Sequence, residues 1–320
     1  MECGFVMPYV MVGRENTGDI RIHYEDHGAG SPVVLVHGWE SSRDRTLPNA
    51  QILNAIGMHV LTIDIRGHGT NPAEELPLTA GEFGEDALAA VEAALGRDDV
   101  TAVGILGHSM GGIGALLAAA AEPRVRGVVA ASTPADPYRL TRQTFKLAKL
   151  PLPGPFAWPL AWLTTHVFLS PRGHTVAGVS AARAIETYQG PVLLIHGDAD
   201  RVVPISHVRA LEAAVEDARE DAPNAGPIEV LVIPGGEHSW LYEFAAYRGA
   251  VASFLSEALG GPLEPDEAEA IARATPAARL PQREHNFSAI ETEPGGVRTL
   301  VRAIRMAGGG PEPKAAEDSK

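Results

Sequence analysis

The chain has 320 residues, a formal net charge of −14 and one cysteine, Cys3. The negative charge argues against a nucleic-acid partner, since phosphates would repel it, and a lone cysteine excludes an intrachain disulfide and permits a reducing compartment. Hydrophobic residues make up 45%, and because no leader peptide and no apolar stretch long enough to cross a bilayer is visible, we expect a cytoplasmic protein without a membrane span.

Apolar runs and helical patterns alternate along the chain. A leading hairpin is predicted at residues 9–12 and 20–25. Predicted strands then follow at 33–36, 60–63, 102–106, 127–131, 192–195 and 230–233, with helices at 51–56, 85–95, 111–121, 206–218 and 245–259. Because the strands are apolar throughout, both of their faces should be buried. The order predicts an α/β fold, in which a mostly parallel central sheet carries helices on both faces.

One stretch, from about residue 134 to 189, interrupts this alternation. It is rich in proline and large apolar residues, and it lies between the predicted strands at 127–131 and 192–195. We interpret it as a segment inserted into the alternating pattern.

One α/β domain is predicted to span residues 1–262, with the segment at about 134–189 as an insertion. Residues 263–320 form a C-terminal extension that we expect to be partly disordered, with one further helix at 266–274.

The segment Gly107-His108-Ser109-Met110-Gly111 follows a predicted strand and begins a predicted helix. A G-x-S-x-G sequence in a strand–turn–helix context is typical of a nucleophile elbow. The glycines leave room for a strained turn that holds the Ser109 hydroxyl clear of the sheet. Ser109 is therefore the candidate nucleophile.

A serine nucleophile needs a base and an acid that orients it, each in a loop after a later strand. The loop after residues 192–195 contains Asp198 and Asp200, of which Asp200 is favoured because it lies further around the loop. Asp198 is expected to hydrogen-bond the turn backbone instead. The loop after the last strand contains His238, the candidate base. Four further histidines lie next to loops at the carboxyl edge: His37, His68, His108 and His196. Of these, His37 and His108 are the candidate pocket residues.

These segments resemble the α/β-hydrolase superfamily over about residues 20 to 258. The matches are the strand and His-Gly loop at 33–39, the D-x-R-G-x-G turn at 64–69, the elbow at 107–111 and G-x-x-D-x-x-x-P at 197–204. The resemblance implies a catalytic domain over residues 1–262 with a small, mainly helical cap inserted at about 134–189. The apolar underside of this cap would line a substrate pocket, with Phe156, Trp158 and Trp162 as candidates. The alternative is a cap that packs on the core and does not touch substrate.

The resemblance also implies an oxyanion hole made by the backbone N–H groups of Trp39 and Met110. Asp64 and Arg66 are interpreted as a structural pair that braces their turn.

The resemblance implies hydrolysis of a small-molecule ester with an apolar acyl or alkyl part, with no metal and no organic cofactor. One alternative is a serine aminopeptidase or amidase, for which Glu40 or Glu237 would have to bind a substrate amine. A cofactor-free acyltransferase, lyase or perhydrolase would use the same three residues, and a non-catalytic binding protein would use none of them. The sequence does not define the oligomeric state.

Overall fold

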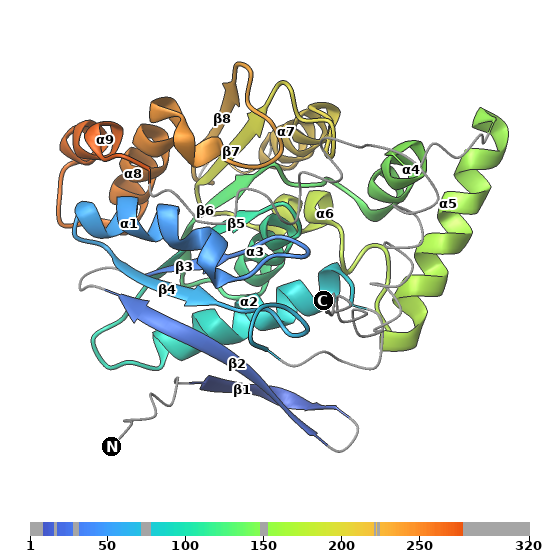
Figure 1. Cartoon of the computed structure of the whole chain (residues 1–320), viewed down its shortest axis with the longest axis horizontal. Coiled ribbons are helices and arrows are strands. Elements are labelled where there is room, and N and C mark those ends of the chain that lie inside the picture. The colour runs from blue at the N-terminus through green and yellow to red at the C-terminus, as the bar shows by residue number, and fades with distance from the viewer. Residues whose placement is uncertain are drawn as a thin grey trace, which may run out of the picture.

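A computed structural model describes residues 9–15, 18–27, 32–71, 78–147, 153–220, 222 and 225–277. Its strands are β1 (Tyr9–Glu15), β2 (Gly18–His27), β3 (Pro32–Val36), β4 (His59–Ile63), β5 (Val103–His108), β6 (Val125–Ala131), β7 (Val192–Gly197) and β8 (Ile228–Ile233). They form one sheet in the order β1-β2-β4-β3-β5-β6-β7-β8 (Figure 1). The hairpin β1–β2 pairs antiparallel with β4, and the strands from β4 to β8 are parallel.

Helices cover both faces of this sheet. They are α1 (Leu47–Ala55), α2 (Ala80–Leu95), α3 (Met110–Ala121), α4 (Pro137–Leu147), α5 (Gly154–Leu169), α6 (Ala181–Thr187), α7 (Ser206–Arg219), α8 (Ala245–Leu259) and α9 (Pro265–Ala274), with short 3-10 turns η1 (Arg43–Thr46), η2 (Ser170–Arg172) and η3 (Leu241–Glu243). One hydrophobic core lies between the sheet and α2, α3, α6 and α7, and a second lies between the sheet and α1, α8 and α9. The predicted fold class is therefore confirmed.

The central strands are buried on both faces, as their unbroken apolar sequence predicts. Every residue of β3 and β4 is buried, whereas β8, at the edge of the sheet, is partly exposed. Among the described residues, no helix is both long and apolar enough to cross a membrane.

Helix α2 begins at Ala80, five residues before the predicted start. A capping box causes the difference: the Thr79 side chain accepts a hydrogen bond from a backbone N–H of the first turn, and Glu82 accepts from the Thr79 N–H. The side chain of Glu82 also contacts His174 at 2.6 Å and Arg172 at 3.5 Å. The start of α2 is therefore tied to the segment after α5.

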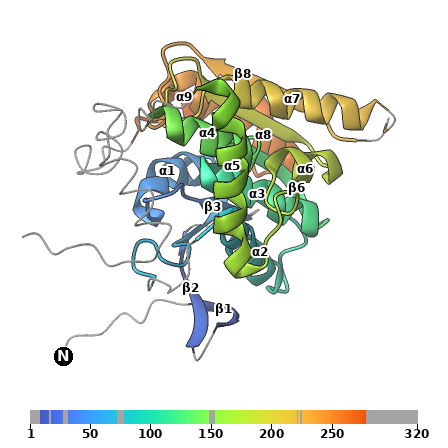
Figure 2. The ribbon, with the colours of Figure 1, turned by 90° about the vertical axis from the view of Figure 1, so that its right-hand side faces the viewer.

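The insertion between β6 and β7 contains α4, α5 and α6, so the expected helical character of the cap is confirmed. Figure 2 shows α4 and α5 side by side across one face of the molecule. Helix α9 packs on α8, with Ala268 and Ala272 fully buried. Residues 278–320 of the C-terminal extension lie outside the described residues, and the predicted domain limits remain a prediction.

Candidate active site

Ser109 lies in a sharp turn between β5 and α3. Its φ of 54° and ψ of −119° place it in a backbone conformation that L-residues rarely adopt. A Cβ atom at Gly107 would collide with the carbonyl of Gly111, and a Cβ at Gly111 would collide with that of Val36. These two positions therefore need glycine for steric reasons, because the start of α3 lies directly against β5 and β3.

The structure brings together the three side chains selected from the sequence. The Ser109 Oγ lies 3.1 Å from His238 Nε2, and His238 Nδ1 lies 2.8 Å from Asp200 Oδ2. A carboxylate can only accept, so His238 Nδ1–H donates to Asp200 and Nε2 is left to accept from the serine hydroxyl. Ser109, Asp200 and His238 are 6%, 7% and 1% exposed, so all three residues are largely shielded from solvent.

Asp200 has donors on both carboxylate oxygens. Its Oδ1 accepts from the backbone N–H groups of Val202 at 2.9 Å and Val203 at 2.8 Å. Its Oδ2 accepts from His238 and lies 3.4 Å from Nε2 of His196. Burial alone would raise the pKa of Asp200, but the charge of His238 and these hydrogen bonds outweigh burial and hold the pKa below its usual value. The carboxyl group therefore stays ionised.

Asp198 has a different place in the same loop. Its Oδ1 accepts from the Gly235 N–H at 2.7 Å, which ties the loop after β7 to the loop after β8. This is a backbone contact of the kind expected for Asp198 from the sequence, although its partner lies in a distant loop.

The backbone N–H groups of Trp39 and Met110 lie beside the serine. Gly38, next to Trp39, is so close to the elbow that a Cβ there would lie 3.2 Å from the Ser109 Cβ. Met110 is the first residue of α3, where the N–H has no intrahelical acceptor. Neither N–H has a backbone acceptor within the described part of the chain. The Trp39 indole stacks on Phe83, with ring centroids 6.0 Å apart.

His37 is buried and His108 is half-buried, and both are neutral side chains that contact the backbone. His37 Nδ1 donates to the Gly38 carbonyl at 2.8 Å while Nε2 accepts from the Ile65 N–H at 3.0 Å, so this side chain holds the loop that contains Trp39. His108 Nε2 donates to the His238 carbonyl at 2.7 Å. Burial, with a smaller effect of neighbouring histidines, lowers the pKa of His37 to about 4 and that of His108 to about 3.

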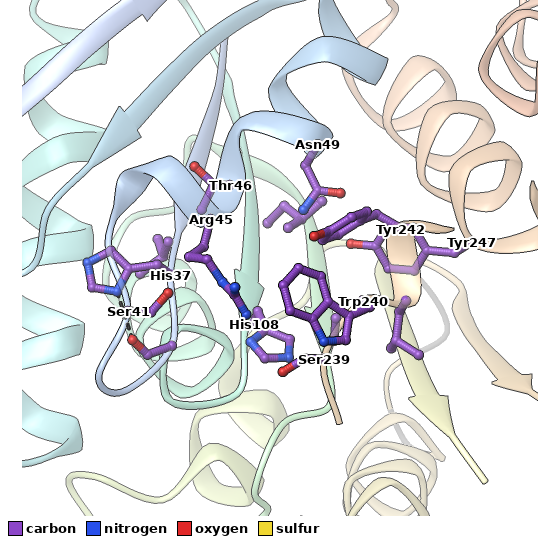
Figure 3. Close-up of a pocket in the computed structure, with 15 residues that line it drawn as sticks. His37, Ser41, Arg45, Thr46, Asn49, His108, Ser239, Trp240, Tyr242 and Tyr247 are labelled. Carbon is purple, nitrogen blue, oxygen red and sulfur yellow. Dashed lines mark hydrogen bonds between the residues drawn. The ribbon is translucent and has the colours of Figure 1, made fainter. Parts of the chain in front are cut away.

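A cavity of about 50 Å³ lies beside this arrangement, on the α1–α8 side of the sheet. Figure 3 shows His37 and Ser41 on one side of it, His108 and Ser239 at another, and Asn49 with Tyr242 and Tyr247 across from them. The guanidinium of Arg45 lies 3.9 Å from the ring centre of Trp240, another lining residue. The buried Asn49 Oδ1 and Ser239 Oγ have no hydrogen-bond partner among the described residues. Both predicted pocket histidines line this cavity.

The other predicted pocket residues lie elsewhere. Phe156, Trp158 and Trp162 are 65%, 51% and 54% exposed on α5, and none of them lines the cavity. Their role in a substrate pocket remains a prediction. Glu40 and Glu237, the candidates for binding a substrate amine, do not line the cavity either.

Asp64 and Arg66 brace their turn, as the sequence predicts. Asp64 forms an ion pair with Arg43 of η1, and Arg66 forms one with Asp86 of α2. The turn is therefore fixed to two neighbouring elements.

His196, which the sequence places next to a loop at the carboxyl edge, does not line the cavity. It is buried next to Asp200, where its Nε2–H donates to the Val203 carbonyl at 2.7 Å. Asn49, Tyr242 and Tyr247 line the cavity without any signal in the sequence, because they reach it from helical segments. Among the described residues, no group of three or more His, Cys, Asp or Glu side chains is placed to hold a metal ion.

Comparison with known proteins gives a consistent result. Residues 33–254 match the model of a family described as "Alpha/beta hydrolase family". A protein of Synechocystis sp. named "Putative non-heme chloroperoxidase" is 28% identical over 272 residues, which cover 73% of this chain and 94% of that protein. Human "Protein ABHD12B" is 26% identical over 240 residues, which are 71% of this chain and 61% of that protein. The crystal structure of Est1E from Butyrivibrio proteoclasticus with bound ferulic acid superposes with a TM-score of 0.59 at 21% identity, over 75% of this chain and 96% of that chain.

Proposed function

Since the chain belongs to the alpha/beta hydrolase family, we propose that it is a serine hydrolase that cleaves carboxylic esters through an acyl-enzyme intermediate. The observation that carries this proposal is the hydrogen-bonded series from Ser109 through His238 to Asp200 at the carboxyl edge of the parallel strands. Ligands of open α/β sheets bind at this edge.

Ser109, His238 and Asp200 each have a defined role in the proposed reaction. Nε2 of His238 takes the hydroxyl proton of Ser109 while Oγ attacks the ester carbonyl carbon. Asp200 holds the proton on Nδ1 and stabilises the imidazolium that forms. The same Nε2–H then protonates the leaving alcohol, and a water molecule, deprotonated by His238, hydrolyses the acyl-enzyme.

We assign the binding of the oxyanion to the backbone N–H groups of Trp39 and Met110. Their lack of a backbone acceptor among the described residues supports this role, as does the position of Met110 at the positive end of α3. Each such donor typically contributes about 3 kcal/mol to transition-state stabilisation. The His37 contacts that fix the Gly38 carbonyl also fix the orientation of the next N–H.

We assign one end of the ester to the cavity between His37, Gly38 and His108. With about 50 Å³, the cavity has room for roughly three to five water-sized groups, so this end is short. The unpartnered Asn49 Oδ1 accepts hydrogen bonds, so a hydroxyl or amino substituent at that end would be favoured over a purely apolar one.

A second candidate is formation of a peracid from a short carboxylate and hydrogen peroxide on the same three side chains. The name of the Synechocystis relative favours it. The two candidates share the acyl-enzyme and differ in whether water or hydrogen peroxide takes up the acyl group.

The test uses p-nitrophenyl esters of increasing acyl length, beside aminoacyl p-nitroanilides and an assay of peracid formation from acetate and hydrogen peroxide. Ester turnover that is highest for short acyl chains and absent in Ser109→Ala is the expected result. Turnover that persists in Ser109→Ala would overturn the proposed nucleophile. Anilide turnover or peracid formation faster than ester turnover would replace the proposed reaction.

A further inference from the structure

The large apolar side chains that remain exposed in the described part of the chain gather on one helix. They are Phe156, Trp158, Leu160, Trp162, Leu163 and Val167, between 37% and 65% exposed, and all six belong to α5. Figure 1 shows α5 as the outermost helix on its side of the molecule, with α4 between it and the helices of the core. Contiguous apolar surface of this kind marks an interaction site.

Helix α5 has one face toward the protein and a different, apolar face away from it. On the face toward the protein, Ala161 is 0% exposed and Thr165 is 4% exposed, with its hydroxyl 2.9 Å from that of Thr141 on α4. The outer face carries, at helical spacing, the side chains of Phe156, Leu160, Leu163 and Val167. Trp158 and Trp162 lie at the margin next to α4, where both remain about half exposed. An ordinary amphipathic helix buries its large apolar stripe, so the outer face of α5 is made for contact with something other than this domain.

The charge around α5 also differs from that of the rest of the chain. Residues 137–185 contain no Asp and no Glu, although the whole chain has a formal net charge of −14. On α4, Arg142 lies over the Trp158 ring at 3.9 Å from its centre, and Lys146 is exposed. Neither cation has an acidic partner among the described residues, whereas Arg139, Arg172 and Arg183 are each paired.

We propose that the outer face of α5, together with Arg142 and Lys146, docks on an anionic lipid surface. Tryptophans are favoured at the lipid–water boundary, and cations beside an apolar face are attracted to anionic headgroups. Helix α5 has 16 residues and is too short to cross a bilayer, so it lies in the plane of the surface.

A second copy of the chain fits this face less well. A two-fold interface through α5 would bring each Arg142 and Lys146 toward their own copies, between two chains that each carry a net charge of −14. An acidic protein partner would match the cations, but the outer face offers few hydrogen-bonding side chains to a protein. A lipid surface needs none.

Docking would also place the proposed reaction beside the lipid. Helices α4 and α5 follow the carboxyl end of β6, the same edge that holds Ser109. The ester substrate would then be an amphiphile drawn from that surface, and this last step rests on the proposed function.

The test measures binding of the full chain to sedimenting vesicles of phosphatidylcholine with phosphatidylglycerol, and of phosphatidylcholine alone. We expect the wild type to bind the anionic vesicles. Leu163→Gln/Val167→Gln should reduce binding at least tenfold, and Arg142→Gln/Lys146→Gln should reduce it several-fold at low salt only. The matched control Arg97→Gln/Arg126→Gln removes two cations at the opposite edge of the sheet and should bind like the wild type.

Two further measurements distinguish lipid docking from self-association and from a loss of folding in the variants. Brominated phosphatidylcholine should quench the fluorescence of the wild type, and Trp158→Phe/Trp162→Phe should lose most of that quenching. Circular dichroism and the thermal midpoint of every variant should match those of the wild type, because the substituted side chains are exposed or half-buried. The proposal would be overturned if the wild type did not bind the vesicles. It would also be overturned if light scattering showed that the wild type is a dimer and that Leu163→Gln dissociates this dimer. Neither outcome depends on esterase activity.

Discussion

Asp198 and Asp200 offer a charge-matched comparison, because Asp→Asn at either position removes one negative charge from the same loop. At Asp200, the amide oxygen of an asparagine must take the place of Oδ1, since two backbone N–H groups point at it from 2.9 and 2.8 Å. The NH2 group then faces His238. The NH2 group donates to Nδ1 and forces the imidazole proton onto Nε2. Nε2 then carries a hydrogen that points at Ser109, so it cannot accept the proton of the serine hydroxyl.

We therefore expect Asp200→Asn to lower kcat for a short-chain ester roughly 10⁴-fold, as the wrong histidine tautomer does in serine proteases. That loss corresponds to about 5.4 kcal/mol of activation free energy. Asp198→Asn keeps an acceptor for the Gly235 N–H and should stay within about threefold of the wild type.

Initial rates with p-nitrophenyl acetate, together with the thermal midpoint of each variant, provide the measurement. The midpoints confirm that a lost rate is not a lost fold. Equal losses in the two variants, or a larger loss in Asp198→Asn, would refute the assignment of Asp200 as the acid.

Three further predictions concern stability. In Gly107→Ala the new Cβ collides with the Gly111 carbonyl, so the free energy of unfolding in urea should fall by about 3 kcal/mol or more, and an unchanged value would contradict the proposed packing of the elbow. The hydrogen bond with Glu82 raises the pKa of His174 above 6.5. The stabilisation of the fold by this ion pair is therefore complete below pH 6.5 and is lost as the pH rises through the raised pKa. The same stabilisation is lost in acid, as the pH falls through the lowered pKa of Glu82. The cost of His174→Gln should accordingly be about 1–2 kcal/mol near pH 6 and should shrink toward pH 9, whereas a cost that does not change with pH would count against the ion pair. Thr62 is fully buried and its hydroxyl has no partner among the described residues, so Thr62→Val should raise the free energy of unfolding by about 1 kcal/mol, and a clear decrease would show that the hydroxyl is satisfied.

The parts of the fold that the sequence predicts well are those with a local cause. The strands at 33–36 and 192–195 are buried on both faces, so their sequence is apolar without interruption and marks them clearly. The elbow is likewise local, because Gly107 and Gly111 are required by atoms within the turn and the adjacent strand. The order of Ser109, Asp200 and His238 along the chain follows from the order of the strands that end beside them.

The parts that could not be predicted depend on packing between distant segments. The partners of Asp64 and Arg66 come from η1 and α2, about twenty residues away in opposite directions, and nothing in the turn itself selects them. The early start of α2 could have been found from Thr79 and Glu82, which have capping-box spacing. The choice of the face of α5 that remains exposed has no local signal, because apolar residues occur on every side of that helix.

The hydrogen bond from His108 to the His238 carbonyl joins the residue before the proposed nucleophile to the backbone of the proposed base. The contact between Asp198 and Gly235 joins the loop of Asp200 to the same segment. The three loops are thus cross-linked into one rigid unit that exists before any substrate arrives. Little reorganisation is left for the moment of bond cleavage, so we expect no lag or slow activation phase in turnover.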